Sequence, residues 1–248
     1  MTYCLALRLD EGLVFLADTR TNAGVDNVGT FRKLHVIQPL PDRLFVIESA
    51  GSLATTHQVL DIIHRDLDRG NAESLATVRH LFEAALYLGR LGREVTPQHE
   101  AALGVSATAT FILGGEIAGD RPDLFLGLPG RHLHPRSDER PFLQIGENKY
   151  GKFLLELGVK AQVDLTSAMK IAISSMVTTA GANLSVGSPY HLGIYRNGSL
   201  QLEELRVDAD SPLLERLQDV WHRHLLAAIE ELPEVSQGDL SPEVWTST

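Results

Sequence analysis

The chain of 248 residues contains a single cysteine, Cys4. One thiol cannot form a disulfide within the chain, and such low cysteine use is typical of a reducing compartment. Because Cys4 lies in an apolar stretch, we interpret it as a buried structural thiol. No apolar run approaches the roughly 20 residues that span a bilayer, and the N-terminus lacks the basic flank and apolar core of a signal peptide. We therefore expect a cytoplasmic protein that does not bind membranes.

Basic residues are also in deficit. The chain carries 22 Lys and Arg against 32 Asp and Glu, a formal net charge of -10. This balance argues against a nucleic-acid-binding surface, which needs clustered cations. His132 with His134, and His222 with His224, lack a third partner at ligand spacing, and no glycine run has a phosphate-loop context. We expect no metal, no cofactor and no nucleic-acid partner.

The first fifty residues are rich in strand-like patterns. Apolar stretches separated by turn residues predict strands at 3–9, 13–18, 31–38 and 43–51. The polar segment 21–30 is interpreted as a loop. Two strands of similar length joined by a short turn bring their outer ends together, so the first hairpin is expected to place Asp18 beside Thr2.

The rest of the chain interleaves helices with further strands. Apolar residues at helical spacing predict helices at 53–69, 74–92, 146–157, 165–182 and 210–232, with Ser52, Ser74 and Ser211 as N-caps. Strands are expected at 106–116, 122–130 and 141–146, and a hairpin at 190–205. This segregated order predicts a layered α+β fold in one domain, 1–232, followed by a polar, flexible tail, 233–248.

Thr2 is the residue with the clearest chemical potential. Removal of Met1 would leave it with a hydroxyl and a free α-amine on one residue. An α-amine has a pKa of about 7.7–8.0, so part of it is neutral near pH 7 and can accept the hydroxyl proton. A cation held by a carboxylate would lower the pKa of the alcohol further. Asp18 and Lys33 are placed to supply that pair, since we expect the strands at 13–18 and 31–38 both to border the first strand.

The spacing of Thr2, Asp18 and Lys33 resembles the N-terminal-nucleophile fold of proteasome β-subunits and HslV-type peptidases. More specifically, the segment TRTNAGVDNVGTFRKLHV, the turn ESAGSLATT, and the motifs IGENKYGK and NLSVGSPYHL are similar to the bacterial Anbu, or ancestral β-subunit, family. The resemblance covers about residues 2–240. It implies a four-layer αββα sandwich, in agreement with the order of strands and helices.

The resemblance also implies roles for particular residues. Thr2 would be the nucleophile with its own amine as base, Lys33 would lower the hydroxyl pKa, Asp18 would hold Lys33, and Arg20 would brace the neighbouring loop. An oxyanion-hole amide is implied in the turn that contains Glu48, Ser49 and Gly51, at Glu48 or Ser49, without deciding which.

Two elements differ from the proteasome pattern. Gly146-Glu147-Asn148 stands where the proteasome has Gly-Ser-Gly, so Glu147 would add a second carboxylate near the α-amine. Asn183, Ser185 and Gly187 stand in for an Asp-x-x-Ser-Gly element, and they can also be interpreted as ordinary turn residues.

Two functions follow from these patterns. The first is a threonine-type peptidase that hydrolyses peptide amide bonds through an acyl-ester. The second is a proteasome-like self-assembling scaffold, or a narrow-specificity amidase, with little general proteolysis. Both imply a homo-oligomeric ring or open spiral, with the helices within 53–92 and the last helix as contact surfaces. The resemblance also allows an unfoldase or accessory partner.

Overall fold

The computed structural model describes residues 2–22, 28–103, 107–127, 134–135 and 140–234. The chain forms two compact units, residues 1–209 and 210–248, which are treated separately below. The expected single domain over 1–232 stays a prediction, and most of the expected tail, 235–248, lies outside the described residues.

The first unit contains a five-stranded antiparallel sheet with the order β10-β1-β2-β11-β12. Its strands are β1 (Tyr3–Arg8), β2 (Gly12–Asp18), β10 (Phe142–Gly146), β11 (Tyr190–Arg196) and β12 (Leu202–Val207). The first hairpin has the predicted pairing, since Cys4 lies opposite Ala17. This register brings the start of β1 to the end of β2.

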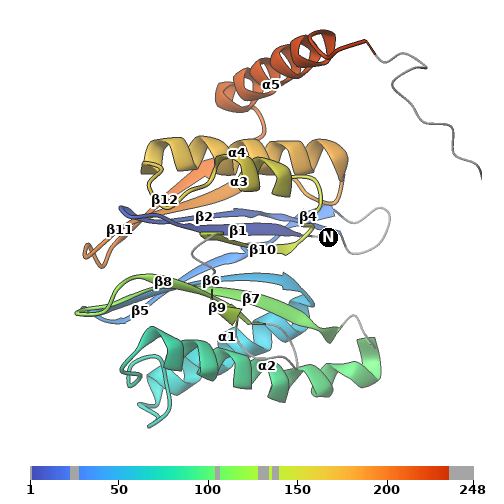
Figure 1. Cartoon of the computed structure of the whole chain (residues 1–248). Helices are drawn as coiled ribbons and strands as arrows, with labels where there is room; N and C mark the ends of the chain where they lie inside the picture. Colours follow the sequence, from blue (N-terminus) through green and yellow to red (C-terminus); the bar gives the residue numbers. More distant parts are fainter. Residues whose placement is uncertain (1, 23–27, 104–106, 128–133, 136–139, 235–248) are drawn as a thin grey trace, which may run out of the picture. The chain divides into compact units, whose positions relative to one another are not determined.

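A second five-stranded antiparallel sheet has the order β5-β6-β7-β8-β9. Its strands are β5 (Leu34–Leu40), β6 (Arg43–Gly51), β7 (Ala109–Ile117), β8 (Asp123–Gly127) and β9 (His134–Pro135). The two sheets stack face to face, as Figure 1 shows.

Helices cover the outer face of each sheet. α1 (Leu53–Asp68) and α2 (Leu81–Leu103) lie on the second sheet, and α3 (Lys152–Gly158) and α4 (Leu165–Ala182) lie on the first (Figure 1). α1 begins at the predicted cap, because the Ser52 hydroxyl accepts a hydrogen bond from Thr55 N. The unit is therefore the expected four-layer αββα sandwich.

The first four strands of the second sheet, β5 to β8, serve two cores through their alternating faces. Phe45 and Ile47 of β6 pack with Val59 and Ile63 of α1 in the core beneath the helices. The opposite face of the sheet packs against the first sheet, and this inter-sheet core includes Cys4, Ala6, Phe15, Leu44, Val46, Ile112 and Leu124. Alternate residues face different cores, so a slip of one residue would move every side chain to the wrong core, and this fixes the strand register.

The segment expected to be a loop, 21–30, has paired ends. β3 (Arg20–Asn22) and β4 (Val28–Thr30) form a two-stranded antiparallel sheet, with Arg20 opposite Thr30. Residues 23–27 lie outside the described residues. The loop prediction is therefore wrong at its ends, where backbone pairing between short polar segments leaves no hydrophobic pattern to detect.

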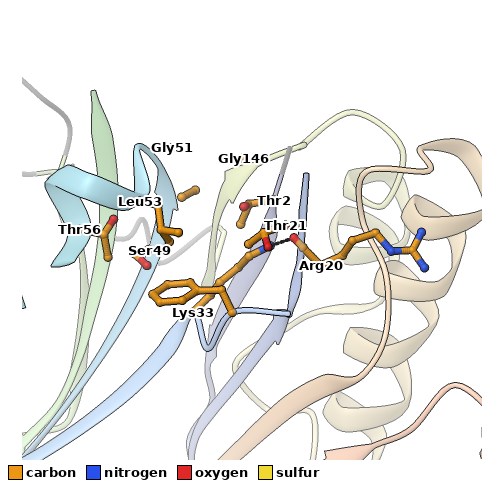
Figure 2. A pocket seen from close by; sticks show the side chains of 11 residues that line it. Thr2, Arg20, Thr21, Lys33, Ser49, Gly51, Leu53, Thr56 and Gly146 are labelled. Carbon is orange, nitrogen blue, oxygen red and sulfur yellow. Dashed lines mark hydrogen bonds between the residues drawn. The ribbon is translucent and has the colours of Figure 1, made fainter. Parts of the chain in front are cut away.

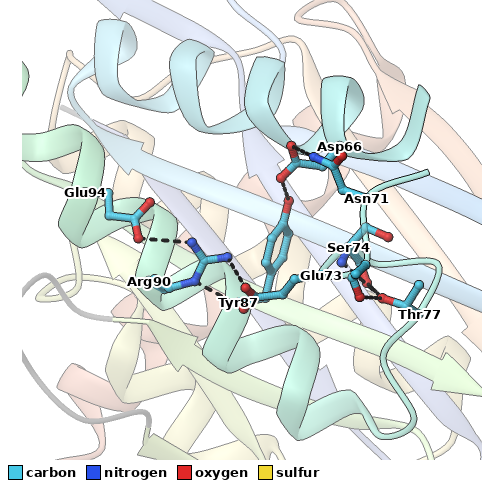
Figure 3. Close-up of polar contacts among 9 residues, drawn as sticks. Asp66, Asn71, Glu73, Ser74, Thr77, Tyr87, Arg90 and Glu94 are labelled. Carbon is cyan, nitrogen blue, oxygen red and sulfur yellow. Dashed lines mark hydrogen bonds and ion pairs between the residues drawn. The ribbon is translucent and has the colours of Figure 1, made fainter. Parts of the chain in front are cut away.

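The second helix was predicted at 74–92 and is found at Leu81–Leu103. Residues 71–80 instead form turns, because Arg43 Nη1 donates to the carbonyls of Ala76 and Val78 at 2.8 Å each. Figure 3 shows this turn segment beside α2, where Tyr87 donates to Asp66 at 2.8 Å. The apolar residues of the segment are buried, but in turns.

Two other boundaries differ from the predictions. α3 begins at Lys152 and not at residue 146, because Gly146 adopts φ +82° and Glu147 N donates to the Thr2 carbonyl. In the second unit, α5 (Pro212–Glu230) matches the predicted helix closely, and its Ser211 cap accepts from Leu213 N. No helix among the described residues is long and apolar enough to cross a membrane.

Gly114 of β7 lies at a close approach of the two sheets. A Cβ atom there would lie 2.6 Å from the Phe15 ring and 2.6 Å from Leu124. We expect Gly114→Ala to lower the free energy of unfolding by about 1–3 kcal/mol, because the core has no space for the methyl group. Chemical denaturation measures the change.

Gly181→Ala in α4 is the matched control, because a Cβ atom there meets open space. It should be neutral or stabilising by up to about 1 kcal/mol. Equal stability of the two variants would contradict the proposed packing at Gly114.

Candidate active site

The first hairpin brings Asp18 to the residue that follows Thr2. Tyr3 N donates a hydrogen bond to Asp18 Oδ1 at 3.0 Å. Gly187 N, in the segment between α4 and β11, donates to Asp18 Oδ2 at 3.2 Å. The predicted proximity of Asp18 to the chain start is confirmed, and both carboxyl oxygens are held by backbone amides.

Lys33 lies directly before β5 and reaches the same carboxyl. Its Nζ donates to Asp18 Oδ1 at 2.6 Å and to the Arg20 carbonyl at 2.7 Å. The side chains are 3% and 0% exposed. Burial raises the pKa of the Asp18 carboxyl above its ordinary value, and the Lys33 ammonium opposes the rise. In Figure 2 the Lys33 side chain extends toward Thr2.

Arg20 supports the loop that follows α4. Its Nη1 donates to the Leu184 carbonyl at 2.7 Å. A Cβ atom on Gly187 would lie 2.4 Å from Arg20 Cζ, so the guanidinium packs against bare backbone. Figure 2 shows the Arg20 side chain directed away from Thr2. The structure thus places Arg20 as a brace for the loop whose Gly187 amide binds Asp18.

Thr2 lines a cavity of about 310 Å³ at the edge of the two sheets (Figure 2). Residues from the end of β6, the start of α1, the segments around β3 and the end of β10 surround it: Arg20, Thr21, Phe31, Lys33, Ser49, Ala50, Gly51, Leu53, Thr56 and Gly146. Among the residues that the structure describes, this lining contains two cations and no carboxyl group. Phe31, Leu53 and Thr56 had not been predicted, because their contribution depends on how α1 meets the end of β6.

The turn at the end of β6 contains the amides considered for an oxyanion hole. Ser49 N already donates to the Lys33 carbonyl at 3.0 Å, and Ser52 N donates to Thr108 O at 2.8 Å. Amides alternate in direction along a strand, so Gly51 N points to the same side as Ser49 N, beyond the start of β5. Gly51 adopts φ +107°, where a side chain would be strained.

Glu48 lies elsewhere than the sequence pattern suggested. Its side chain is fully buried and absent from the cavity lining. Neither carboxyl oxygen has a hydrogen-bond partner at bonding distance. Burial raises the pKa of this carboxyl well above its ordinary value, with a small opposing effect from the Leu16 backbone. The expected substrate-lining position of Glu48 is therefore not what the structure shows, because its strand position faces the other sheet.

The Gly146–Glu147 turn contacts Thr2 through its backbone. Glu147 N donates to the Thr2 carbonyl at 2.7 Å. A Cβ atom on Gly146 would lie 1.9 Å from the same oxygen, so only glycine fits. Glu147 Oε2 accepts from Asn183 Nδ2 at 3.0 Å, and Asn183 Oδ1 accepts from Ser185 N at 3.0 Å. Glu147, Asn183 and Ser185 form a support beside Thr2 and do not line the cavity.

Tyr3 and Ser175 form a buried polar contact close to Thr2. The Tyr3 hydroxyl lies 2.8 Å from Ser175 Oγ, which in turn donates to the Gly151 carbonyl at 2.9 Å. This bond ties β1 to α4 directly after Thr2. The sequence contained a partial signal, since Ser175 shares the apolar face of its helix. Cys4 is fully buried as predicted, and burial raises the pKa of its thiol well above the ordinary value.

Two sheets packed between two helix layers, with the chain start at the sheet edge, define the N-terminal-nucleophile hydrolase fold of the proteasome β-subunit type. Within the described ranges, no group of three or more His, Cys, Asp or Glu is placed to hold a metal ion.

Solved structures identify the family. The chain is 36% identical to "Anbu (ancestral beta-subunit)" from Yersinia bercovieri, with a TM-score of 0.87 over 95% of this chain and 100% of that one. It is 34% identical to Anbu from Pseudomonas aeruginosa, with a TM-score of 0.89 over 96% and 99% of the chains. Anbu from Hyphomicrobium sp. strain MC1 is 37% identical, with a TM-score of 0.86 over 94% and 99%. No family model and no curated relative matches. The chain belongs to the Anbu family.

The isolated carboxyl of Glu48 has a consequence for stability. Because its folded-state pKa is raised, the stability it contributes is fully present below the unfolded-state pKa of about 4.3 and is lost as pH rises through the folded-state value. We expect Glu48→Gln to match the parent near pH 4 and to become progressively more stable than the parent as pH rises. Thermal unfolding from pH 4 to 9 measures the difference.

Glu156→Gln on α3 is the control, because that side chain is 40% exposed. Its difference from the parent should stay within about 0.5 kcal/mol across the range. A Glu48→Gln curve parallel to that of the parent would show that Glu48 is not isolated from solvent.

Proposed function

We propose that this protein is a threonine-type hydrolase that cleaves amide bonds in peptides once Met1 has been removed. The observation that carries the proposal is the buried ammonium of Lys33, which is fixed by Asp18 at 2.6 Å in the cavity that Thr2 lines. A cation held beside a hydroxyl lowers the free energy of the alkoxide. A purely structural ion pair would not need to reach the cavity.

The proposed reaction uses Thr2 twice. Its α-amine takes the hydroxyl proton as Oγ1 attacks the substrate carbonyl, and the new C–O bond gives a tetrahedral oxyanion. Gly51 N is our candidate donor to that oxyanion, because Ser49 N is already bonded to Lys33 O. The α-ammonium then protonates the leaving amine as the C–N bond breaks. Water hydrolyses the resulting ester and returns the hydroxyl proton to Thr2.

The cavity lining favours particular substrates. Phe31, Ala50 and Leu53 supply apolar surface, while Arg20 and Lys33 are the charged residues among the described part of the lining. A basic side chain would be placed among cations without a carboxylate partner. We infer that the substrate is a peptide or small amide with an apolar residue before the cleaved bond.

A second candidate function is self-assembly with narrow or weak hydrolysis. The support is twofold: Glu147 adds a carboxyl beside Thr2, and one related structure is described as the "Helical Assembly of the Anbu Complex from Pseudomonas aeruginosa". We propose that this chain also forms a homo-oligomer, as an open spiral. An unfoldase or accessory partner remains part of the proposal without a contact surface assigned to it.

The nucleophile is tested on a chain that begins at Thr2. With peptides carrying apolar, acidic or basic residues before the cleaved bond, we expect turnover of the apolar set. Thr2→Ala should lower the rate by at least about a thousandfold, because no other residue supplies both the hydroxyl and the amine. An epoxyketone or boronate peptide probe with mass spectrometry should label Thr2 only when Met1 is absent.

Thr2→Ser is the matched control, because it keeps both reacting groups and should retain measurable turnover. Equal hydrolysis by Thr2→Ala and the parent would refute the proposed nucleophile. Failure of every variant to hydrolyse or label would favour the assembly function.

Self-assembly makes a separate prediction. Leu225, Ile229 and Leu232 of the second unit are 53%, 63% and 66% exposed at helical spacing, a pattern that suits contact with another subunit. We expect light scattering at micromolar concentration to give a mass of many subunits. Leu225→Glu with Ile229→Glu should shift it to smaller species, whereas Ala227→Glu on the opposite face of the same helix should not. A monomeric parent chain would exclude the proposal.

A further inference from the structure

Glu147 is the acidic side chain most closely joined to Thr2 that the proposed reaction does not use. Its backbone amide holds the Thr2 carbonyl at 2.7 Å, and its side chain is 7% exposed. Both carboxyl oxygens are occupied by neutral donors, Lys149 N at 3.2 Å and Asn183 Nδ2 at 3.0 Å. Within the described ranges no ion pair includes Glu147. It is a largely buried acid without a cationic partner.

The hydrogen bonds that hold the Glu147 side chain continue through Asn183 to the other side of Thr2. Asn183, which ends α4, accepts from Ser185 N, and two residues later Gly187 N donates to Asp18 Oδ2. Asp18 in turn binds Tyr3 N and Lys33. Hydrogen bonds and short stretches of backbone therefore connect the two sides of Thr2, from its carbonyl, which Glu147 N holds, to the Tyr3 amide, which Asp18 holds. The carboxyl of Glu147 occupies a defined position in that connection.

The other charged side chains that the structure describes beside Thr2 include a neutralised pair and one further cation. On the side of β2 and β5, Asp18 and Lys33 neutralise each other at 2.6 Å. Arg20 adds a positive charge from β3, bound to a carbonyl. The first turn of α1 contributes the uncharged Leu53 and Thr56 to the described cavity lining. His57 of α1 contacts the lining residue Phe31, with ring centroids 4.9 Å apart. Lys149 lies two positions after Glu147, in the turn that follows β10. Loss of Met1 would add an α-amine to this environment.

We propose that Glu147 is a positioning residue for Thr2: its side chain anchors the turn that holds the Thr2 carbonyl, and its negative charge keeps the α-amine of the processed chain in the ammonium form at neutral pH. The proposal rests on the proposed function, because it requires removal of Met1. A nearby carboxylate favours an ammonium, whereas Arg20 and Lys33 disfavour it. The α-amine is therefore mostly protonated near pH 7, where it cannot accept the hydroxyl proton, and it becomes available as the base as pH rises.

The test titrates the α-amine itself and needs no turnover. The full chain beginning at Thr2 is treated with an amine-selective acylating reagent from pH 6 to 10, and mass spectrometry follows acylation of Thr2. The parent midpoint should lie above the ordinary upper value of about 8.0. Glu147→Gln should lower the midpoint by on the order of one pH unit and speed acylation at pH 7 up to about tenfold.

A folded variant is needed to separate this role from a merely structural one, because loss of the fold would also return the midpoint to the ordinary value of about 7.7–8.0. Thermal unfolding therefore checks that Glu147→Gln is folded at the start of the titration. Glu156→Gln should leave the midpoint unchanged, as a matched loss of an exposed charge. Adding Asn183→Asp to Glu147→Gln restores a carboxyl–amide pair with the charge on the other partner. That double variant should recover most of the lost shift.

Several results would overturn the proposal. They are a parent midpoint below about 7.7, an unchanged midpoint in folded Glu147→Gln, or no recovery in the double variant. A parent midpoint below about 7.7 refutes the proposal whether or not Glu147→Gln folds. A chain that titrates as expected but hydrolyses nothing would keep this proposal and refute the hydrolase. A Thr2-dependent hydrolase with an ordinary α-amine would do the reverse.

Discussion

The buried ion pair of Asp18 and Lys33 is the interaction on which the rest of the site depends. Asp18 ends a strand of the first sheet, and Lys33 directly precedes a strand of the second, so their 2.6 Å contact joins the two sheets at one edge. Removing two charges from water costs several kcal/mol each, which is offset only when further hydrogen bonds hold both groups. Tyr3 N, Gly187 N and the Arg20 carbonyl provide those bonds.

Backbone approaches around this pair require glycine at two places. Gly146 lets the turn after β10 touch the Thr2 carbonyl, and Gly51 lets the end of β6 pass close to Thr108. Both turns border the cavity. The site is thus assembled mainly by main-chain geometry, while side chains supply its charges. This explains why a fold of two packed sheets can hold an exposed chain start in a defined position beside a buried cation.

The sequence predicted the elements whose hydrophobic pattern and local geometry agree. The first hairpin, the cap of α1 and α5 were found as expected. The prediction failed at α2, where Leu75 and Val78 are buried at helical spacing but Arg43 binds the carbonyls of their segment. Arg43 lies more than thirty residues earlier, so no local pattern could reveal that contact.

By itself, the sequence determined the layered fold and the proximity of Thr2 and Asp18, because strand pairing across a short turn is a local consequence of hydrophobic period. The expected pairing of the strand after Lys33 with the first strand is wrong, since β5 lies in the second sheet and Lys33 reaches Asp18 only because the two sheets pack. The tertiary structure decided what the neighbouring polar residues can do. It placed Glu48 between the sheets, occupied Ser49 N with a carbonyl, and joined Glu147 to Asn183 across 36 positions of the chain. These outcomes depend on which face of each strand meets which layer, and that is settled only when the two sheets pack.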